Sequence, residues 1–374
     1  MALFKKYYSS FRSVEPERIV SREFGYIPFT GSMVRHVAFQ SHADLRRFLS
    51  TTVPRHVYYS TAYYRKPEER NMQDKEWMGA ELIFDLDADH IEGVTELTYE
   101  QTLDIVKSHA RRLIEKFLLR EMGMEPAELR VFFSGGRGYH VHVVSEKVYS
   151  LDSDMRREIS NYIRAEGLSI QEIRKNATSV RYNGSGWVGE LDSRISEFYS
   201  EIASGGIMDH LLERAGLNPE KYVSKLRSRF INKRPRLDIL KTPGQEKYKI
   251  MDSDDEKLWQ VLLSDLSISE RVEIDSPVTT DTHRLIRLPG SLHGKTGLMV
   301  KEIAIDHLSE FDPLVEAIPN SFLDGTVRIA SENSFQVSMN GEHFSVPEGE
   351  CDVPTYLGVY ASASRKSQII FTIS

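Results

Sequence analysis

The stretch that decides the fold is Glu81-Leu82-Ile83-Phe84-Asp85-Leu86-Asp87. Its apolar and polar side chains alternate, which predicts a β-strand with Leu82, Phe84 and Leu86 on one face. Asp85 and Asp87 then project side by side from the opposite face. Their negative charges repel each other unless a cation lies between them, and hard oxygen ligands favour Mg²⁺ or Mn²⁺ over softer metals. The alternative for this stretch alone is a pair of solvated carboxylates at a strand end.

The composition is that of an ordinary globular protein. The 374 residues are 40% hydrophobic and 28% charged, with no apolar run of membrane-spanning length and no apolar signal-peptide core at the N-terminus. The single cysteine, Cys351, excludes an intramolecular disulfide, a cysteine zinc site and an iron–sulfur cluster, so we expect a cytoplasmic protein. The formal net charge is −7, and any binding of nucleic acid must therefore use local basic patches.

A second informative stretch is Ser134-Gly135-Gly136-Arg137-Gly138-Tyr139-His140. Glycine permits a positive φ and a close approach of a ligand to the backbone, and successive N–H groups in such a turn can bind an anion. Ser134 and Arg137 add donors, and His140 lies on the strand predicted to follow. The spacing matches neither a Walker A loop nor a dinucleotide-binding fingerprint. The alternative is a glycine-rich hairpin with a surface arginine.

A third stretch follows Asp275, which we place at the end of a strand predicted over 271–275. After His283, four cationic or imidazole side chains crowd residues 284–297, a segment that is broken by proline and glycine: Arg284, Arg287, His293 and Lys295. A carboxylate followed by such groups suits a site for a metal-bound triphosphate, where negative oxygens and divalent cations alternate. The alternative is a charged surface loop.

All three stretches have the form of a strand followed by a turn, so we expect them to form one site. Carboxylates would bind two metal ions, and the other donors would bind phosphates. Two-metal chemistry lowers the pKa of an attacking hydroxyl and stabilises a pyrophosphate leaving group, and it requires no side-chain nucleophile. The sequence contains no Gly-x-Ser-x-Gly or His-Glu-x-x-His motif that would indicate one.

The three stretches also resemble, in their order, the three motifs of the archaeal–eukaryotic primase small (catalytic) subunit family. The motif residues are Phe84-Asp85-Leu86-Asp87, the glycine-rich stretch 134–140, and His283 to His293; the resemblance covers most of residues 1–310. It implies an α/β (α+β) fold, with a mixed-sheet catalytic core and an inserted helical subdomain.

The resemblance also implies roles for individual residues. The catalytic carboxylates, which bind Mg²⁺ or Mn²⁺, would be Asp85, Asp87 and Asp275. The phosphates of the incoming nucleotide would be bound by a second set: Ser134, Arg137, His140, Arg287 and His293, with Arg35 contributing nearby.

One feature departs from the family pattern. Many members carry a zinc-binding cluster between the first and second motifs, whereas this chain has no cysteine in that interval and only His90 and His109. We therefore expect no zinc. The iron–sulfur cluster of the family belongs to its large subunit, which agrees with the single cysteine.

The chain is predicted to divide into a discontinuous catalytic core, residues 1–148 and 269–374, and a helical insertion at 149–268. Within the core we expect a capped helix after Thr98, a helix over 280–288 that ends before Pro289, and a hairpin at Asn340-Gly341. The β-rich tail at 327–374 has no predicted role.

The function expected from these features is that of a DNA-directed primase catalytic subunit. It would join nucleoside triphosphates on a single-stranded DNA template into short primers, as the partner of a primase large subunit and without a membrane. Three alternatives remain open at this point. They are a stand-alone repair or end-joining polymerase of the same superfamily, a metal-dependent glycosyltransferase with its Asp-x-Asp pair, and a nucleic-acid-binding subunit that has lost catalysis.

Overall fold

The computed structural model describes residues 1–11, 16–91, 93, 97–179, 184–206, 208–230 and 234–373. The chain forms two compact units. The first contains residues 1–119, 123–160 and 273–374, and the second contains residues 120–122 and 161–272. The helical insertion was predicted at 149–268. The helix α5 (Ser153–Ile163) lies within that range, but most of its residues belong to the first unit.

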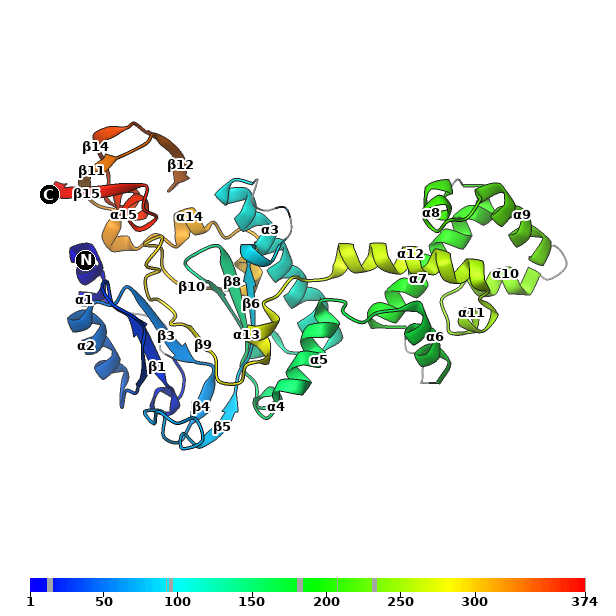
Figure 1. The fold of residues 1–374 in the computed structure, drawn as a ribbon, viewed down its shortest axis with the longest axis horizontal. Coiled ribbons are helices and arrows are strands. Elements are labelled where there is room, and N and C mark those ends of the chain that lie inside the picture. Colours follow the sequence, from blue (N-terminus) through cyan, green and yellow to red (C-terminus); the bar gives the residue numbers. More distant parts are fainter. Residues whose placement is uncertain are drawn as a thin grey trace. The chain divides into compact units, whose positions relative to one another are not determined.

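A four-stranded sheet in the first unit contains the Asp-x-Asp strand. Its strand order is β10-β7-β8-β6, and each pair is antiparallel. The bounds are β6 Leu82–Asp87, β7 Leu129–Phe133, β8 Gly138–Val143 and β10 Lys301–Ile303. The apolar face predicted for β6 is buried, with Leu82, Phe84 and Leu86 at most 1% exposed. The strands predicted around the first two motifs are therefore confirmed (Figure 1).

A second four-stranded sheet has the order β2-β1-β3-β9, and its pairs are also antiparallel. The bounds are β1 Phe24–Ile27, β2 Val34–Val37, β3 His56–Ser60 and β9 Leu285–Arg287. The α/β fold class is confirmed, and the finding adds that every strand pair among the described residues is antiparallel, where a mixed sheet was expected.

Two local predictions around the third motif are wrong. The helix expected over 280–288 is instead α13 (Ser276–Thr280) followed by strand β9, because pairing of Tyr58 with Arg287 fixes this segment from a distant part of the chain. The strand expected over 271–275 has no ladder. The amide of Glu273 donates to the Nδ1 atom of His109, and the amide of Asp275 donates to the carbonyl of Asp85. Each of these backbone amides thus has its own partner, and the two do not pair with one neighbouring strand.

Helices support the two sheets. The helix α3 (Tyr99–Arg112) packs on β6 and β8 and continues as the π-helical segment η4 (Leu113–Glu121); its predicted capping box between Thr98 and Gln101 is present. The helix α1 (Ala2–Ser9) supports the third motif, because its Tyr7 hydroxyl donates to the carbonyl of Gly290 at 2.5 Å. The first unit also contains the helices α2 (His42–Thr52), α4 (Glu146–Tyr149) and α14 (Pro313–Glu316).

A buried charge network holds the start of β6. The carboxylate of Glu81 is paired with Arg22, accepts a hydrogen bond from the Tyr63 hydroxyl at 2.8 Å, and lies 3.1 Å from the Nδ1 atom of His142. Burial alone would raise the pKa of Glu81, but Arg22 and His142 lower it to about 2. The strand that carries the carboxylates therefore begins at an immobilised point.

The C-terminal part of the first unit is β-rich, as expected. The strands β11 (Thr326–Ser331), β14 (Gly349–Pro354) and β15 (Ser367–Ile373) form a sheet in the order β14-β11-β15. The hairpin of β12 (Phe335–Met339) and β13 (Glu342–Val346) turns at Asn340 and Gly341, both with positive φ, so this prediction is confirmed. The helix α15 (Thr355–Ala363) follows β14, and a short pair of strands, β4 (Ala62–Tyr64) and β5 (Trp77–Ala80), completes the unit.

The second unit is helical. Its described helices are α6 (Ile170–Ser179), α7 (Gly186–Ser204), α8 (Asp209–Arg214), α9 (Pro219–Phe230), α10 (Arg234–Lys241), α11 (Glu246–Ile250) and α12 (Ser253–Glu270). Its core includes Trp259, which is fully buried and donates from Nε1 to the hydroxyl of Tyr199 at 3.1 Å. None of the helices in the described ranges is long and apolar enough to cross a bilayer.

Candidate active site

The Asp-x-Asp pair lies at the end of β6, opposite the glycine-rich loop. The strand pairing sets Asp85 against His140 and Asp87 against Gly138. The Nε2 atom of His140 lies 3.5 Å from Oδ1 of Asp85, which is too long for a strong hydrogen bond. Burial and the neighbouring carboxylates of Asp87 and Asp275 raise the pKa of Asp85 to about 7. The chain thus holds carboxylates together at an electrostatic cost.

Asp275 is brought to this pair by α13, which packs on β6. Its amide donates to the carbonyl oxygen of Asp85 at 2.8 Å, and its charge contributes to the raised pKa of Asp85. Asp275 is the N-cap residue of α13 and does not end a strand. The three carboxylates predicted as a set are therefore neighbours in the structure.

The loop between β7 and β8 is closed by its own backbone and by the third motif. The amide of Ser134 donates to the carbonyl of Gly138 at 2.9 Å, and Gly135 has φ +77°. A Cβ atom on Gly135 would lie 2.7 Å from the Cβ of His293, and one on Gly138 would lie 2.3 Å from a backbone oxygen of β6. Glycine is needed here for close packing of the two motifs as well as for the turn.

His293 is fixed against this loop through Thr296. The Thr296 hydroxyl donates to the carbonyl of Gly135 at 2.5 Å and lies 3.2 Å from Nδ1 of His293. A threonine hydroxyl has one proton, so Nδ1 of His293 is the donor of the second contact. Burial, and then the charge of Arg287, lower the pKa of His293 to about 2. The ring is therefore neutral and presents a lone pair at Nε2.

Arg287 reaches the site from the other sheet. It donates from Nη1 to Nδ1 of His56 at 2.9 Å and lies over the ring of Tyr58. Burial, followed by the charges of Arg287 and Arg55, lowers the pKa of His56 to about 3, so this imidazole is a neutral acceptor. Arg287 is held at two points before any ligand binds.

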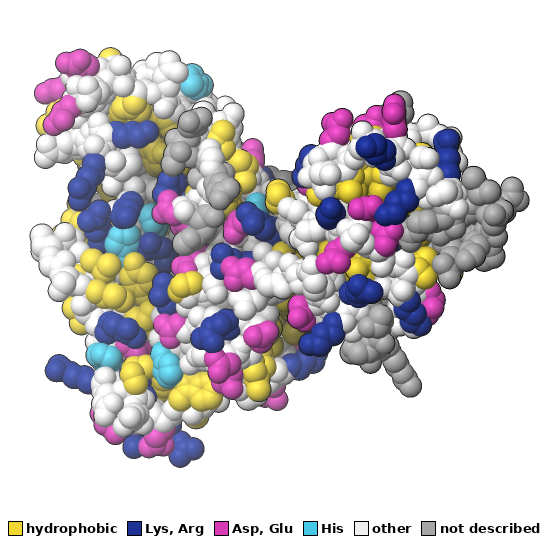
Figure 2. Space-filling view, turned by 45° about the vertical axis from the view of Figure 1, so that its right-hand side comes forward, with side chains coloured by type: hydrophobic (Ala, Val, Ile, Leu, Met, Phe, Trp, Pro, Cys, Tyr) yellow, Lys and Arg dark blue, Asp and Glu magenta, His cyan; other side chains and the backbone are white. Residues whose placement is uncertain are grey.

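Most of the site residues predicted from the sequence line one cleft of about 790 Å³, which we call the main cleft; Asp275 is not among its lining residues. Three aspartates contribute to its lining, Asp85, Asp87 and Asp89, and the remaining residues are mostly donors or cations: Arg55, Tyr99, Ser134, Gly136, Arg137, His140, Arg287, His293, Lys295, Thr296, Tyr360, Ala363, Ser364 and Arg365. Figure 2 shows Lys and Arg side chains, with histidine among them, gathered on the surface of the first unit. Carboxylates and anion-binding groups thus meet in one place.

Five of the six residues predicted to bind nucleotide line the main cleft: Ser134, Arg137, His140, Arg287 and His293. Arg35 is not one of the lining residues. It lies on β2, where its guanidinium forms a two-point ion pair with Glu23 at 2.9 and 3.3 Å. Its contribution to nucleotide binding stays a prediction.

Some lining residues were given no role from the sequence. Lys295 was counted among the charged groups of the third stretch but was not assigned to the nucleotide. Tyr99 follows a helix cap and Arg55 precedes β3, and neither carries a local signal. Tyr99 nevertheless donates from its hydroxyl to the carbonyl of Gly136, and Arg55 donates to the carbonyl of Gly294 at 3.1 Å. These two side chains thus hold the backbone of the second and third stretches in place.

The donor chemistry fits a divalent hard cation. No group of three or more His, Cys, Asp or Glu side chains in the described part of the chain is arranged as a ready-made metal site. However, after burial, the charges of Asp87 and Asp275 contribute to the raised pKa of Asp85, and a divalent cation beside Asp85 would relieve this repulsion. Carboxylate oxygens are the ligands that Mg²⁺ and Mn²⁺ prefer.

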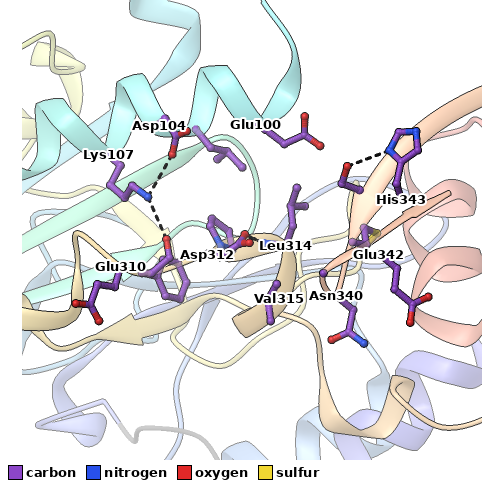
Figure 3. Close-up of a pocket in the computed structure, with 16 residues that line it drawn as sticks. Glu100, Asp104, Lys107, Glu310, Asp312, Leu314, Val315, Asn340, Glu342 and His343 are labelled. Atoms are coloured by element: carbon purple, nitrogen blue, oxygen red, sulfur yellow. Dashed lines mark hydrogen bonds and ion pairs between the residues drawn. The ribbon is translucent and has the colours of Figure 1, made fainter.

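A smaller cavity of about 440 Å³ lies beside α3 and has the opposite character. Figure 3 shows its carboxylates, Glu100, Asp104, Glu310, Asp312 and Glu342, and also Lys107, which is paired with Asp104 and donates to the carbonyl of Phe311. This acidic lining would repel a triphosphate. The main cleft is therefore the candidate active site.

Comparison with known proteins shows which family has this fold and site. Residues 84–305 match the family model described as DNA primase small subunit. A protein of Picrophilus torridus named DNA primase small subunit PriS is 42% identical over 367 residues, which cover 98% of this chain and 96% of the relative. Proteins with the same name from Thermoplasma volcanium and Natronomonas pharaonis are 37% and 35% identical, covering 98% and 93% of this chain and 96% and 92% of the relatives. The chain belongs to the DNA primase small subunit family.

Proposed function

We propose that this chain is the catalytic subunit of a DNA primase, which joins nucleoside triphosphates into short primers on single-stranded DNA during replication. The observation that carries the proposal is the composition of the main cleft. Carboxylates that repel one another lie on one strand, and anion-binding groups from two other motifs face the same space. A nucleotide bound through its phosphates would place negative oxygens between these two sets.

In this proposal Asp85, Asp87 and Asp275 hold Mg²⁺ or Mn²⁺. When bound, such ions favour the deprotonated form of the attacking hydroxyl and neutralise the pyrophosphate leaving group. The 3′-hydroxyl of one nucleotide forms a bond to the α-phosphorus of the next, the bond to pyrophosphate breaks, and the hydroxyl proton passes to solvent. The expectation of no bound zinc and the expected cytoplasmic location stay predictions.

The phosphate-binding groups act by being held in place. The hydroxyl of Ser134 accepts a hydrogen bond from the amide of Gly136 at 3.3 Å, which leaves its own proton for a ligand. Arg287 is braced by His56, and Arg137 is paired with Asp89 at the surface. Preorganised donors favour the charge that develops on the phosphates without reorganising during the reaction.

The test is primer synthesis on unprimed single-stranded DNA with labelled nucleotides, for the purified chain alone and with a primase large subunit. We expect short products that require template and either Mg²⁺ or Mn²⁺. Extension of primed templates with no synthesis on unprimed ones would favour the repair-polymerase alternative. Absence of nucleotide joining under all these conditions would contradict the proposal.

A further inference from the structure

The C-terminal helix α15 forms part of the main cleft, although no motif lies in it and the matched family region ends at residue 305. Tyr360, Ala363, Ser364 and Arg365 line the cleft together with residues of all three motifs. A role for this segment therefore has to be argued from its own contacts.

The position of α15 is fixed by close packing. Its residues from Thr355 to Ala361 are buried. A Cβ atom on Gly358 would lie 2.2 Å from a methyl group of Val327, and one on Gly297 would lie 2.4 Å from a methyl group of Val359. Gly297 belongs to the loop that carries His293 and Lys295, so α15 packs directly against the loop that follows the third motif.

The turn after α15 has an arginine, Arg365, at a position where helix ends commonly have glycine. The amide of Arg365 donates to the carbonyl of Ser362 at 3.2 Å, and the amide of Lys366 donates to the carbonyl of Ala361 at 2.8 Å. Arg365 has φ +61°, a left-handed conformation that helix ends commonly give to glycine. The chain thus holds a long cationic side chain in a conformation that non-glycine residues adopt at some cost, as functional sites often do.

The charge of Arg365 is uncompensated. Among the described residues no acidic side chain pairs with Arg365, which is exposed. Arg328, an arginine of the same C-terminal sheet, is by contrast paired with Asp352 at 2.6 and 2.8 Å and lies over Phe371. A cation that lines a cleft without a partner is available to an anionic ligand.

The anion-binding groups of the main cleft differ in how far they are buried. Ser134, His140 and His293 are buried, and Nε2 of His140 lies 3.5 Å from Asp85, whereas Arg137, Lys295 and Arg365 are exposed. Because the bond-forming phosphorus must lie near the carboxylates, the phosphate furthest from it extends toward the exposed cations. A DNA backbone phosphate, with one charge, would use these cations less fully than a terminal phosphate with two.

We propose that Arg365, together with Lys295, binds the terminal phosphate of the incoming nucleoside triphosphate. This rests on the proposed function and assigns the C-terminal segment a part in choosing triphosphates over diphosphates. The contact supplies affinity at the exposed part of the cleft and leaves the reacting atoms to the three motifs.

The test compares the binding of a nucleoside triphosphate and the matching diphosphate, each with Mg²⁺, to the full chain. The variant is Arg365→Asn, because asparagine tolerates the left-handed conformation, and the matched control is Arg328→Asn. We expect Arg365→Asn to weaken triphosphate binding roughly tenfold, as for one lost charge-assisted contact, with diphosphate binding unchanged. Arg365→Lys should recover part of the loss, and Arg328→Asn should match the wild type.

Equal weakening of both nucleotides, or loss of single-stranded DNA binding with unchanged triphosphate binding, would overturn the assignment. Wild-type binding of triphosphate with no effect of Arg365→Asn would overturn it as well, while leaving the proposed function intact. A wild-type chain that neither binds nor joins nucleoside triphosphates would instead contradict the proposed function itself.

Discussion

A buried carboxylate of the second unit, Asp255, and a partly buried one of the first unit, Asp85, have different surroundings. In the second unit, Asp255 accepts hydrogen bonds from the hydroxyls of Tyr199 and Tyr222, both at 2.8 Å. In the first unit, Asp85 has His140 at 3.5 Å and two further carboxylates as neighbours, and its pKa is raised to about 7 by burial and by those carboxylates. Asp255 is supplied with donors by its own unit, whereas the effect of two neighbouring carboxylates on Asp85 outweighs that of Arg287 and Arg284.

The difference shows how a structural acid and a ligand-binding acid can be distinguished. A buried carboxylate with internal donors stabilises the fold, and removing a partner exposes the cost of burying the charge. For a carboxylate that lies among other carboxylates, the fold disfavours the ionised form. A bound cation would reverse this, so such a group is a candidate for ligand binding. Substitutions at these two kinds of carboxylate should therefore have opposite effects on activity and stability.

The largest effect is expected at the three carboxylates of the candidate active site. Asp85→Asn, Asp87→Asn and Asp275→Asn should each reduce nucleotide joining by about 10³-fold or more, because each removes a negative oxygen ligand from a coupled set. Their thermal unfolding should be unchanged or shifted to higher temperature, since repulsion is reduced. Primer synthesis and a melting curve on the same preparation would measure both. Near-normal synthesis by a folded variant would remove that residue from the catalytic set.

The next effect concerns stability in the second unit. Lys247 and Asp192 form a fully buried ion pair at 2.6 Å, and Lys247 also donates to the Ser196 hydroxyl at 2.7 Å. Lys247→Met should lower the free energy of unfolding of this unit by roughly 3–5 kcal/mol, because it leaves a buried charge without its cation. Urea unfolding followed by tryptophan fluorescence in a Trp77→Phe background reports this unit, which contains the other two tryptophans.

The control for Lys247→Met is Arg214→Met, which breaks the exposed pair with Asp265 in the same unit. Solvent screens that pair, so little change is expected. Equal destabilisation by the two substitutions would show that the buried pair has no special role.

A smaller effect should separate nucleotide use from template binding. Arg137→Ala removes a preorganised donor of the main cleft and should lower the rate of nucleotide joining roughly 10²-fold. The matched control is Arg328→Ala, which removes an arginine paired outside the cleft. Steady-state rates and single-stranded DNA affinity should be measured for both. Lost DNA affinity with unchanged nucleotide kinetics in Arg137→Ala would contradict the assignment to phosphates.

The smallest effect is a change in protonation at His293. Its Nδ1 donates to Thr296 and its pKa is lowered to about 2 by burial, so a phosphate oxygen would meet a lone pair at Nε2. Binding should therefore raise this pKa and take up as much as one proton, and affinity should fall as pH rises. Calorimetry in buffers of different ionisation heat would count the protons. His293→Gln should take up fewer protons than the wild type, and identical uptake would contradict the account.

The parts of the site that could be predicted are those with a local pattern. The alternation around Asp85 and the glycines around Arg137 describe their own strands and turn, and both are present. The segment before Arg287 was wrongly predicted as a helix, because its pairing with Tyr58 is set by contacts between residues more than 200 positions apart. Arg365 could not be predicted, since its place in the cleft depends on packing of α15 against Gly297. Patterns within a strand or turn are readable, and contacts between distant segments are not.

The central claim is that the carboxylates of the main cleft bind the divalent metal of a metal–nucleotide complex. The most direct measurement is electron paramagnetic resonance of Mn²⁺ titrated with the full chain and a non-hydrolysable nucleoside triphosphate. The wild type should retain Mn²⁺, Asp85→Asn and Asp87→Asn should bind it at least roughly tenfold more weakly, and Glu310→Gln, which changes a carboxylate of the smaller cavity, should match the wild type. Equal retention of Mn²⁺ by the wild type and Asp85→Asn would contradict the claim.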